Sequence, residues 1–236
     1  MVENLKELSI EILLYIFRKL DSIRTLLSVV LTCKAFHNIF HDNKNGVVNS
    51  VTINQIPAEL WPFIYALLDS NLVATKYDGH VQDNPGQMEA ICTTVADKIL
   101  TTLTQSIQEP AVGLSQHHNL TALDESFIVC QVKAMNSLRG QFIEDTIPNL
   151  KRRLRLSRPA QASLVEKFRI ERALLRYQLM CNLHCIREVQ DTDGDPFFNN
   201  FSPWVNEQLL CVYAFLARKV RTGKPIVHAC HIVSGT

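Results

Sequence analysis

The amino-acid sequence predicts an all-α protein in which a small N-terminal module of three helices precedes a larger, irregular helical bundle. Three observations lead to this prediction. Long stretches place apolar residues three or four positions apart, which is the spacing of one helix face. Gly and Pro are sparse, with 8 and 9 among 236 residues, so few positions break those stretches. Hydrophobic residues make up 47% of the chain, which is enough for a packed core.

The N-terminal segment, residues 1–45, opens on a helix whose apolar residues cover more than one face. In LSIEILLYIF, residues 8–17, only Ser9 and Glu11 are clearly polar. Three short helices of this size lie near the lower limit for independent folding, where little apolar surface can be concealed. The surplus must therefore be covered either by the rest of the chain or by another protein.

Polar residues punctuate the remainder of this segment. Asp21 and Ser22 form a break, and either side chain can cap the helix expected around 26–31. A third helix begins near Phe36. The turn-forming sequence DNKNG, residues 42–46, closes the segment and marks the predicted end of the first domain.

The second predicted domain, residues 46–236, begins with a short extended stretch and continues as helices. VVNSVTI at 47–53 is a weak strand signal, or a linker. Helices are then expected over 57–68, 88–103, 123–143, 164–186 and 203–220. At the start of the last one, Ser202 suits the N-cap and Pro203 the first helical position. No internal repeat is present.

Charge, hydropathy and cysteine content narrow the class of protein. A formal net charge of +1 and a pI near 7.6 provide no general attraction to nucleic acid or anionic membrane. The apolar run LLCVYAFLA at 209–217 is far shorter than the roughly 20 residues of a membrane span. No signal peptide is visible, and the 7 cysteines are an odd number. We therefore expect reduced thiols in a cytoplasmic and/or nuclear protein rather than a secreted disulfide framework.

The N-terminal segment LSIEILLYIFRKLDSIRTLLSVVLTCKAFHNIF, residues 8–40, resembles the F-box. The positions that match the pattern of that family are Leu8, Glu11, Ile12, Leu13, Ile16, Leu20, Leu26, Leu27, Val29, Cys33, Lys34 and Phe36. One departure is Ser9, which stands where the family usually has a proline in the region that touches its partner. Ser9 can still cap the first helix and preserve its entry geometry.

A second resemblance lies toward the C-terminus. RALLRYQLMCNL at 172–183 and FSPWVNEQLLCV at 201–212 are similar to two helices of fungal F-box proteins, an R-A-x-x-R-x-x-L helix and a P-W-x-x-E-Q-L helix. The residue after the tryptophan, often acidic in that pattern, is Val205 here. Both resemblances point to a fungal F-box domain-containing protein.

This resemblance implies an adaptor and not an enzyme. F-box proteins dock on the Skp-type linker protein of a cullin ubiquitin ligase and present a target for ubiquitination, while other subunits carry the chemistry. The implied partners are that linker and an unknown target protein, without nucleic acid, membrane, metal or cofactor. The residues expected to bind the linker are Leu8, Ile10, Ile12, Leu13, Ile16, Leu20, Leu26, Leu27, Leu31 and Phe36.

Two other functions stay open at this point. In the first, the N-terminal helices pack on the chain's own body, and the protein is an interaction scaffold outside any ligase. In the second, the protein is a small metal- or thiol-dependent enzyme. Cys181, His184 and Cys185, with HACH at 228–231, are ligand types for zinc, although neither group has the usual spacing.

The remaining motifs favour ordinary structural explanations. KRRLRLSR at 151–158 carries five positive charges, and a solvated face explains it better than a nuclear localisation signal or phosphate binding. DTDGD at 191–195 starts like a calcium loop but lacks the required glutamate, so a polar loop is expected. No nucleophile or phosphate-loop motif is present. Glu207 is expected to pair with Arg176 or to accept a hydrogen bond from Tyr177 on a neighbouring helix.

Overall fold

The computed structural model describes residues 8–77, 85–109, 120–154, 161–186 and 196–223. Every regular element in those ranges is a helix, which confirms the all-α class. The α-helices are α2 (Ile10–Arg18), α3 (Ile23–Val30), α4 (Lys34–Asp42), α5 (Lys44–Asn54), α6 (Trp61–Tyr77), α7 (Pro85–Gln108), α9 (Ala122–Leu154), α10 (Leu164–Ile186), α11 (Pro196–Asn199) and α12 (Pro203–Arg221). A short 3₁₀ turn, Ala58–Leu60, precedes α6.

The chain divides into two compact units. Unit 1 comprises residues 1–58 and 120–132, and unit 2 comprises residues 59–119 and 133–236. The long helix α9 therefore contributes its first turns to unit 1 and the remainder to unit 2. Among the described residues, no helix is both long and apolar enough to traverse a bilayer.

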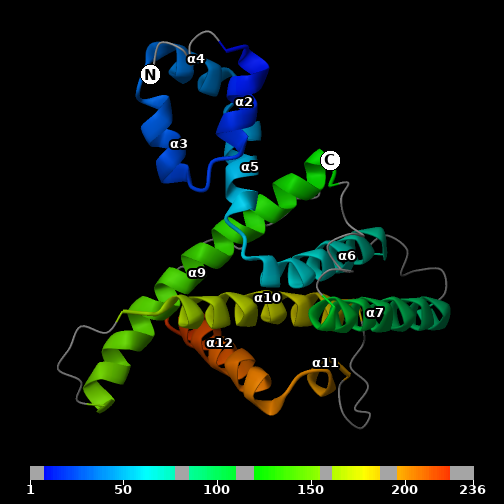
Figure 1. Ribbon diagram of the computed structural model, residues 1–236. Coiled ribbons are helices and arrows are strands. Elements are labelled where there is room, and N and C mark those ends of the chain that lie inside the picture. Colours follow the sequence, from blue (N-terminus) through cyan, green and yellow to red (C-terminus); the bar gives the residue numbers. More distant parts are fainter. Residues whose placement is uncertain (1–7, 78–84, 110–119, 155–160, 187–195, 224–236) are drawn as a thin grey trace. The chain divides into compact units, whose positions relative to one another are not determined.

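In unit 1, the helices α2 to α5 form a small bundle around one apolar core (Figure 1). Helical spacing explains the core, because α2 contributes Leu13 and Phe17 and α3 contributes Leu26 and Val30, each pair four residues apart. The ring of Phe17 meets the ring of Phe36 on α4 edge-on, with 5.8 Å between their centres. The core is completed by Val47 and Val51 from α5.

The prediction of a weak strand or a linker at residues 47–53 is wrong, because these residues lie within the helix α5. Several β-branched residues produced the strand signal, but that propensity is weak and yields to packing. Helical geometry brings Val47 and Val51 to one face, where both are completely buried. Residue 45, the predicted end of the first domain, lies inside this helix.

The start of α3 is fixed by the predicted cap at Ser22. The hydroxyl oxygen of Ser22 accepts a hydrogen bond from the backbone N–H of Thr25, with an N–O distance of 3.0 Å. We expect Ser22→Ala to destabilise α3 by about 1 kcal/mol, because one helix N–H then loses its partner. In hydrogen exchange of the full chain, the amides of α3 should exchange about fivefold faster.

The matched control for this prediction is Ser22→Asp. An aspartate at the N-cap accepts the same hydrogen bond, so exchange in α3 should stay near the wild-type rate. Equal exchange rates in the alanine variant and the wild type would show that the cap does not hold this helix.

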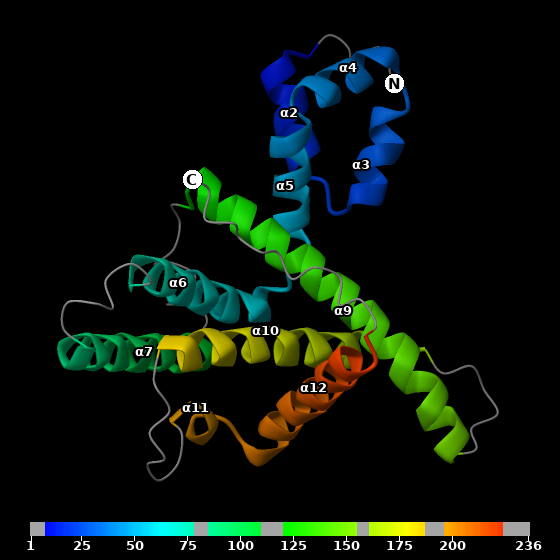
Figure 2. The ribbon, with the colours of Figure 1, turned by 180° about the vertical axis from the view of Figure 1, so that it is seen from behind.

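Unit 2 is built around α10, with α6 on one side and α12 on the other (Figures 1 and 2). Helix α7 packs on α6 and also contacts α10. Because neighbours cover α10 on more than one face, its apolar residues do not form a single stripe. The buried apolar residues of α10 are Ala173, Leu174, Leu175, Leu179 and Leu183.

Two helix boundaries in unit 2 follow directly from the local sequence, and a third does not. Ser163 and Glu166 form a reciprocal cap at the start of α10, since Ser163 N–H donates to the Glu166 carboxylate over 2.7 Å. The backbone and hydroxyl of Ser163 lower the pKa of that carboxyl group. Ser202 is the N-cap residue and Pro203 the first residue of α12, as predicted, but the Ser202 side chain makes no capping hydrogen bond. In contrast, α9 continues beyond residue 143, where its end was predicted, and runs through Pro148.

Polar contacts attach the second part of α9 to the rest of unit 2. Arg139 forms a salt bridge with the buried Glu171 on α10. The carboxylate of Asp145 lies 3.0 Å from the ammonium nitrogen of the buried Lys219 on α12. Both buried charges therefore have a partner, as burial requires.

The cysteines do not all behave as expected. Cys33, Cys181 and Cys211 are not part of a disulfide, in agreement with the expectation of reduced cysteines. Cys130 is disulfide-bonded, so that expectation is wrong at this position.

Candidate partner-binding surface

Helix α2 leaves an apolar stripe exposed on the side opposite its core residues. Because Leu13 and Phe17 face the core, the residues half a turn away point outward. Ile12 and Tyr15 lie there, with 48% and 64% of their surface exposed. The ammonium group of Lys19 lies 5.7 Å from the centre of the Tyr15 ring, so a positive charge borders the stripe.

Helix α3 repeats this arrangement. Leu26 and Val30 are buried in the core of unit 1. Leu27 and Leu31, which are one helical turn apart, are 48% and 77% exposed. We call the residues Ile12 and Tyr15 on α2, with Leu27 on α3 and Leu31 at the C-cap of α3, the outer stripes of unit 1.

The outer stripes are more than scattered surface leucines. A single exposed apolar residue is normal in a folded protein, but paired residues on adjacent helical turns form a surface that water solvates poorly. Removing such surface from water is worth roughly 25 cal/mol for each Å². Ile10, at the start of α2, is also 55% exposed and adds to this surface. Unit 1 therefore presents apolar surface suited to binding a protein.

The ten residues expected to bind a partner fall into different environments. Ile10, Ile12, Leu27 and Leu31 are exposed. Leu8 and Leu20 pack partly against the core, and Ile16 is half-buried. Leu13, Leu26 and Phe36 are core residues of unit 1. The burial of each residue is thus known, whereas its contact with a partner stays a prediction.

Tyr15 is the outer-stripe residue that the sequence reasoning missed. Its position three residues after Ile12 was a usable signal, because positions i and i+3 share a helix face. The expectation for Ser9 also needs a correction. Ser9 occupies the N-cap of α2, but its side chain makes no capping hydrogen bond. A backbone hydrogen bond and the Ser9 hydroxyl instead lower the pKa of the Glu11 carboxyl group.

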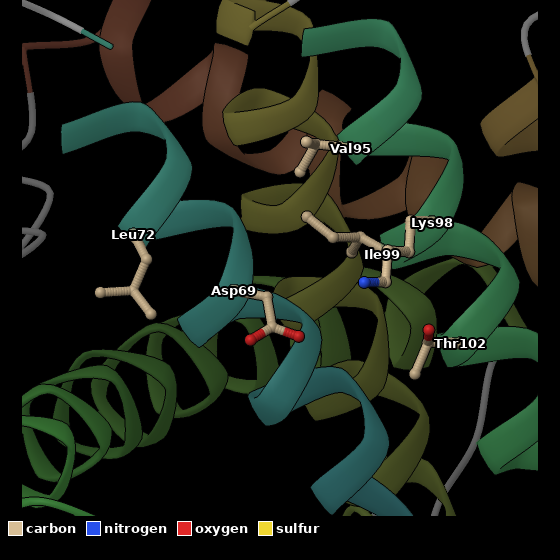
Figure 3. Close-up of a pocket in the computed structure, with 6 residues that line it drawn as sticks. All are labelled: Asp69, Leu72, Val95, Lys98, Ile99 and Thr102. Atoms are coloured by element: carbon tan, nitrogen blue, oxygen red, sulfur yellow. The ribbon is translucent and has the colours of Figure 1, made fainter. Parts of the chain in front are cut away.

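Unit 2 contains a second candidate surface, a hollow of about 300 Å³ between α6 and α7. Figure 3 shows the residues that line it, which are Asp69 and Leu72 on α6 with Val95, Lys98, Ile99 and Thr102 on α7. Ile99 is buried, whereas Lys98 is exposed. The hollow combines apolar surface with a cation and a carboxylate.

A buried arginine organises the contact between α10 and α12. The side chain of Arg176 is fully buried and donates hydrogen bonds of 2.8 Å to the carbonyl of Val205 and to the side-chain oxygen of Asn206. Its guanidinium lies over the ring of Phe201, 3.8 Å from the ring centre. Burial, with a smaller effect of Arg172, lowers the pKa of Arg176 to about 10.

The predicted pairing of Arg176 with Glu207 is therefore wrong. Glu207 is exposed, and the neighbouring Asn206 accepts the hydrogen bond instead. Asn206 is held in place because its amide group also donates to the carbonyl of Phe198 over 2.9 Å. The R-A-x-x-R and P-W segments thus meet through Arg176 and the backbone and amide groups of α12.

The chemistry-like motifs are only partly covered by the structure. HACH at 228–231 and DTDGD at 191–195 lie outside the described residues, as does the end of the basic stretch at 155–158. Within the described ranges, no group of three or more His, Cys, Asp or Glu side chains is arranged to hold a metal ion.

The fold and its surfaces define a class of protein: a small helical module with exposed apolar stripes, joined to a helical body whose apolar core contains the buried Arg176. The F-box-like family model matches residues 10–45, which comprise α2, α3, α4 and the start of α5. The chain thus carries an F-box-like domain, in the segment that presents the outer stripes. No curated protein and no solved structure matches the chain.

Proposed function

We propose that this protein is the substrate-recognition adaptor of a Skp–cullin–F-box ubiquitin ligase. It docks on a Skp-type linker protein through unit 1 and presents an unknown target protein for ubiquitination. The single observation that carries this proposal is the position of the outer stripes, which fall entirely within the residues that match the F-box-like model. Proteins with F-box-like domains act as interaction adaptors, and the other ligase subunits supply the chemistry.

The outer stripes take no part in the core of unit 1, which uses other faces of α2 and α3. Leu31 is 77% exposed and Tyr15 is 64% exposed. A protein partner that covers both removes this surface from water, which is the main favourable term in association.

Unit 2 supplies the surfaces for the target in this proposal. The hollow between α6 and α7 is one such surface (Figure 3). The similarity of residues 172–183 and 201–212 to helices of fungal F-box proteins supports a fungal member of the family. Such an adaptor works where the ligase works, in the cytoplasm and/or the nucleus.

The direct test is co-expression of the full chain with a Skp-type linker protein. We expect the two to co-elute in size-exclusion chromatography as a 1:1 complex. Because apolar contacts carry the interface, the complex should persist at about 0.5 M salt, where surface ion pairs are screened. Separate elution of the two proteins at both low and high salt would refute the adaptor function.

A further inference from the structure

One face of helix α12 carries large apolar side chains that are exposed. Leu209, Val212 and Phe215 are buried on its inner face, which packs on α10. The opposite side carries apolar residues at spacings of three and four, and we call it the α12 outer face: Leu210, Tyr213, Ala214, Ala217 and Val220. The large members are well exposed, with Leu210 at 60%, Tyr213 at 54% and Val220 at 65%.

Opposite charges lie at the two ends of this face. Ala214 lies at the centre of this face. Glu207 precedes Ala214 by seven residues, and Arg221 follows it by seven. Seven residues are almost two helical turns, so these three residues lie nearly in line along the helix. Glu207 and Arg221 are both exposed, and neither forms an ion pair with another residue of the described ranges.

We propose that the α12 outer face packs against the same face of a second copy of this chain, with the two helices antiparallel. A two-fold axis near Ala214 brings Glu207 of each copy to Arg221 of the other, so attractive pairs form at both ends. A parallel arrangement would instead place like charges together. The small side chains of Ala214 and Ala217 allow the helices to approach closely at the centre.

The proposed dimer goes beyond the adaptor function and does not depend on it. The α12 outer face belongs to unit 2, whereas the outer stripes belong to unit 1. A dimer held by one pair of helices has a small interface, so its affinity is expected in the micromolar range. In a ligase, such a dimer would present two F-box modules.

Charge reversal tests the two-fold arrangement in the full chain by sedimentation velocity between about 1 and 100 µM. The wild type should shift from monomer to dimer across this range. Glu207→Arg alone and Arg221→Glu alone each create two like-charge contacts in a dimer, and each should weaken dimerisation by about tenfold or more. An equimolar mixture of the two variants should recover the dimer, because every contact in the mixed dimer is then attractive. The double variant should also recover it.

Replacement of an exposed apolar residue by aspartate tests the apolar part of the α12 outer face. Leu210→Asp should keep the protein monomeric, whereas Ile107→Asp on α7, where the side chain is 41% exposed, should dimerise like the wild type. A monomeric wild type at 100 µM would overturn the proposal and leave the face to a different protein. Failure of the mixed variants to recover the dimer would overturn the antiparallel arrangement. A monomeric variant that still binds the Skp-type linker would show that the two interfaces are separate.

Discussion

Replacing Ile12 and Leu31 together by aspartate is expected to abolish binding of the Skp-type linker. Both side chains are exposed, so the fold of unit 1 should tolerate the change. In a complex, each aspartate would bury a carboxylate against apolar surface without a partner. Interface residues of this kind contribute about 2 kcal/mol or more each, so the Kd should rise by about 1,000-fold or more.

The linker experiment needs a control for the effect of a surface charge. Leu164→Asp serves, because Leu164 on α10 is 82% exposed and lies outside the F-box-like segment. This variant should bind the linker like the wild type. Isothermal titration calorimetry with the purified linker protein measures the Kd of the wild type, the double variant and Leu164→Asp. A double variant that binds with unchanged affinity would exclude the outer stripes as the docking surface.

Core residues of unit 1 are unsuited to the same experiment. Leu13 is only 4% exposed, and an aspartate at this position would bury a charge in the core. Loss of binding in Leu13→Asp would therefore reflect unfolding as readily as a missing contact. The distinction between Leu13 and Ile12 depends on which face of α2 meets the core.

Replacing Arg176 by alanine is expected to destabilise unit 2 by about 3 kcal/mol. The change removes two hydrogen bonds, which leaves the carbonyl of Val205 and the amide of Asn206 without this donor. Buried polar groups left unpaired cost about 1–3 kcal/mol, and the lost stacking on Phe201 adds to that cost. Arg176→Lys should be nearly as damaging, because an ammonium group cannot reproduce the planar fork.

Tryptophan fluorescence measures this effect specifically. The chain has two tryptophans, Trp61 and Trp204, and both belong to unit 2. Chemical denaturation followed by this signal therefore reports unit 2 without assuming that the whole chain unfolds in one step. Arg169→Ala, on an exposed position of the same helix, is the control and should change stability by less than about 0.5 kcal/mol. If Arg176→Ala changed stability as little as Arg169→Ala, Arg176 would not be the residue that organises the contact between α10 and α12.

Much of the fold follows from local signals in the sequence. Apolar spacing of three and four residues located most of the helices, and Ser22, Ser202 and Pro203 marked two of their starts. The F-box pattern located the module that the family model then matched. These features depend on neighbours within one helical turn, and the sequence displays such neighbours directly.

The predictions that were wrong have a different property in common. The helix α5 was missed because the valines at 47 and 51 are helical only when the core of unit 1 receives them. The partner of Arg176 was assigned to Glu207 because charge suggested an ion pair, while the packed helices placed Asn206 within reach. Neither result depends on neighbours along the chain.

The sequence by itself thus determined that this protein is helical, that an F-box-like segment leads it, and that this segment has surplus apolar residues. Only the tertiary structure decided which of those apolar residues are exposed and which are buried. Periodicity shows that Ile12, Leu13, Leu27 and Leu31 are apolar positions on helices, but exposure depends on which neighbour covers each face. Packing buries Leu13 and leaves the other three in water, where a second protein can reach them.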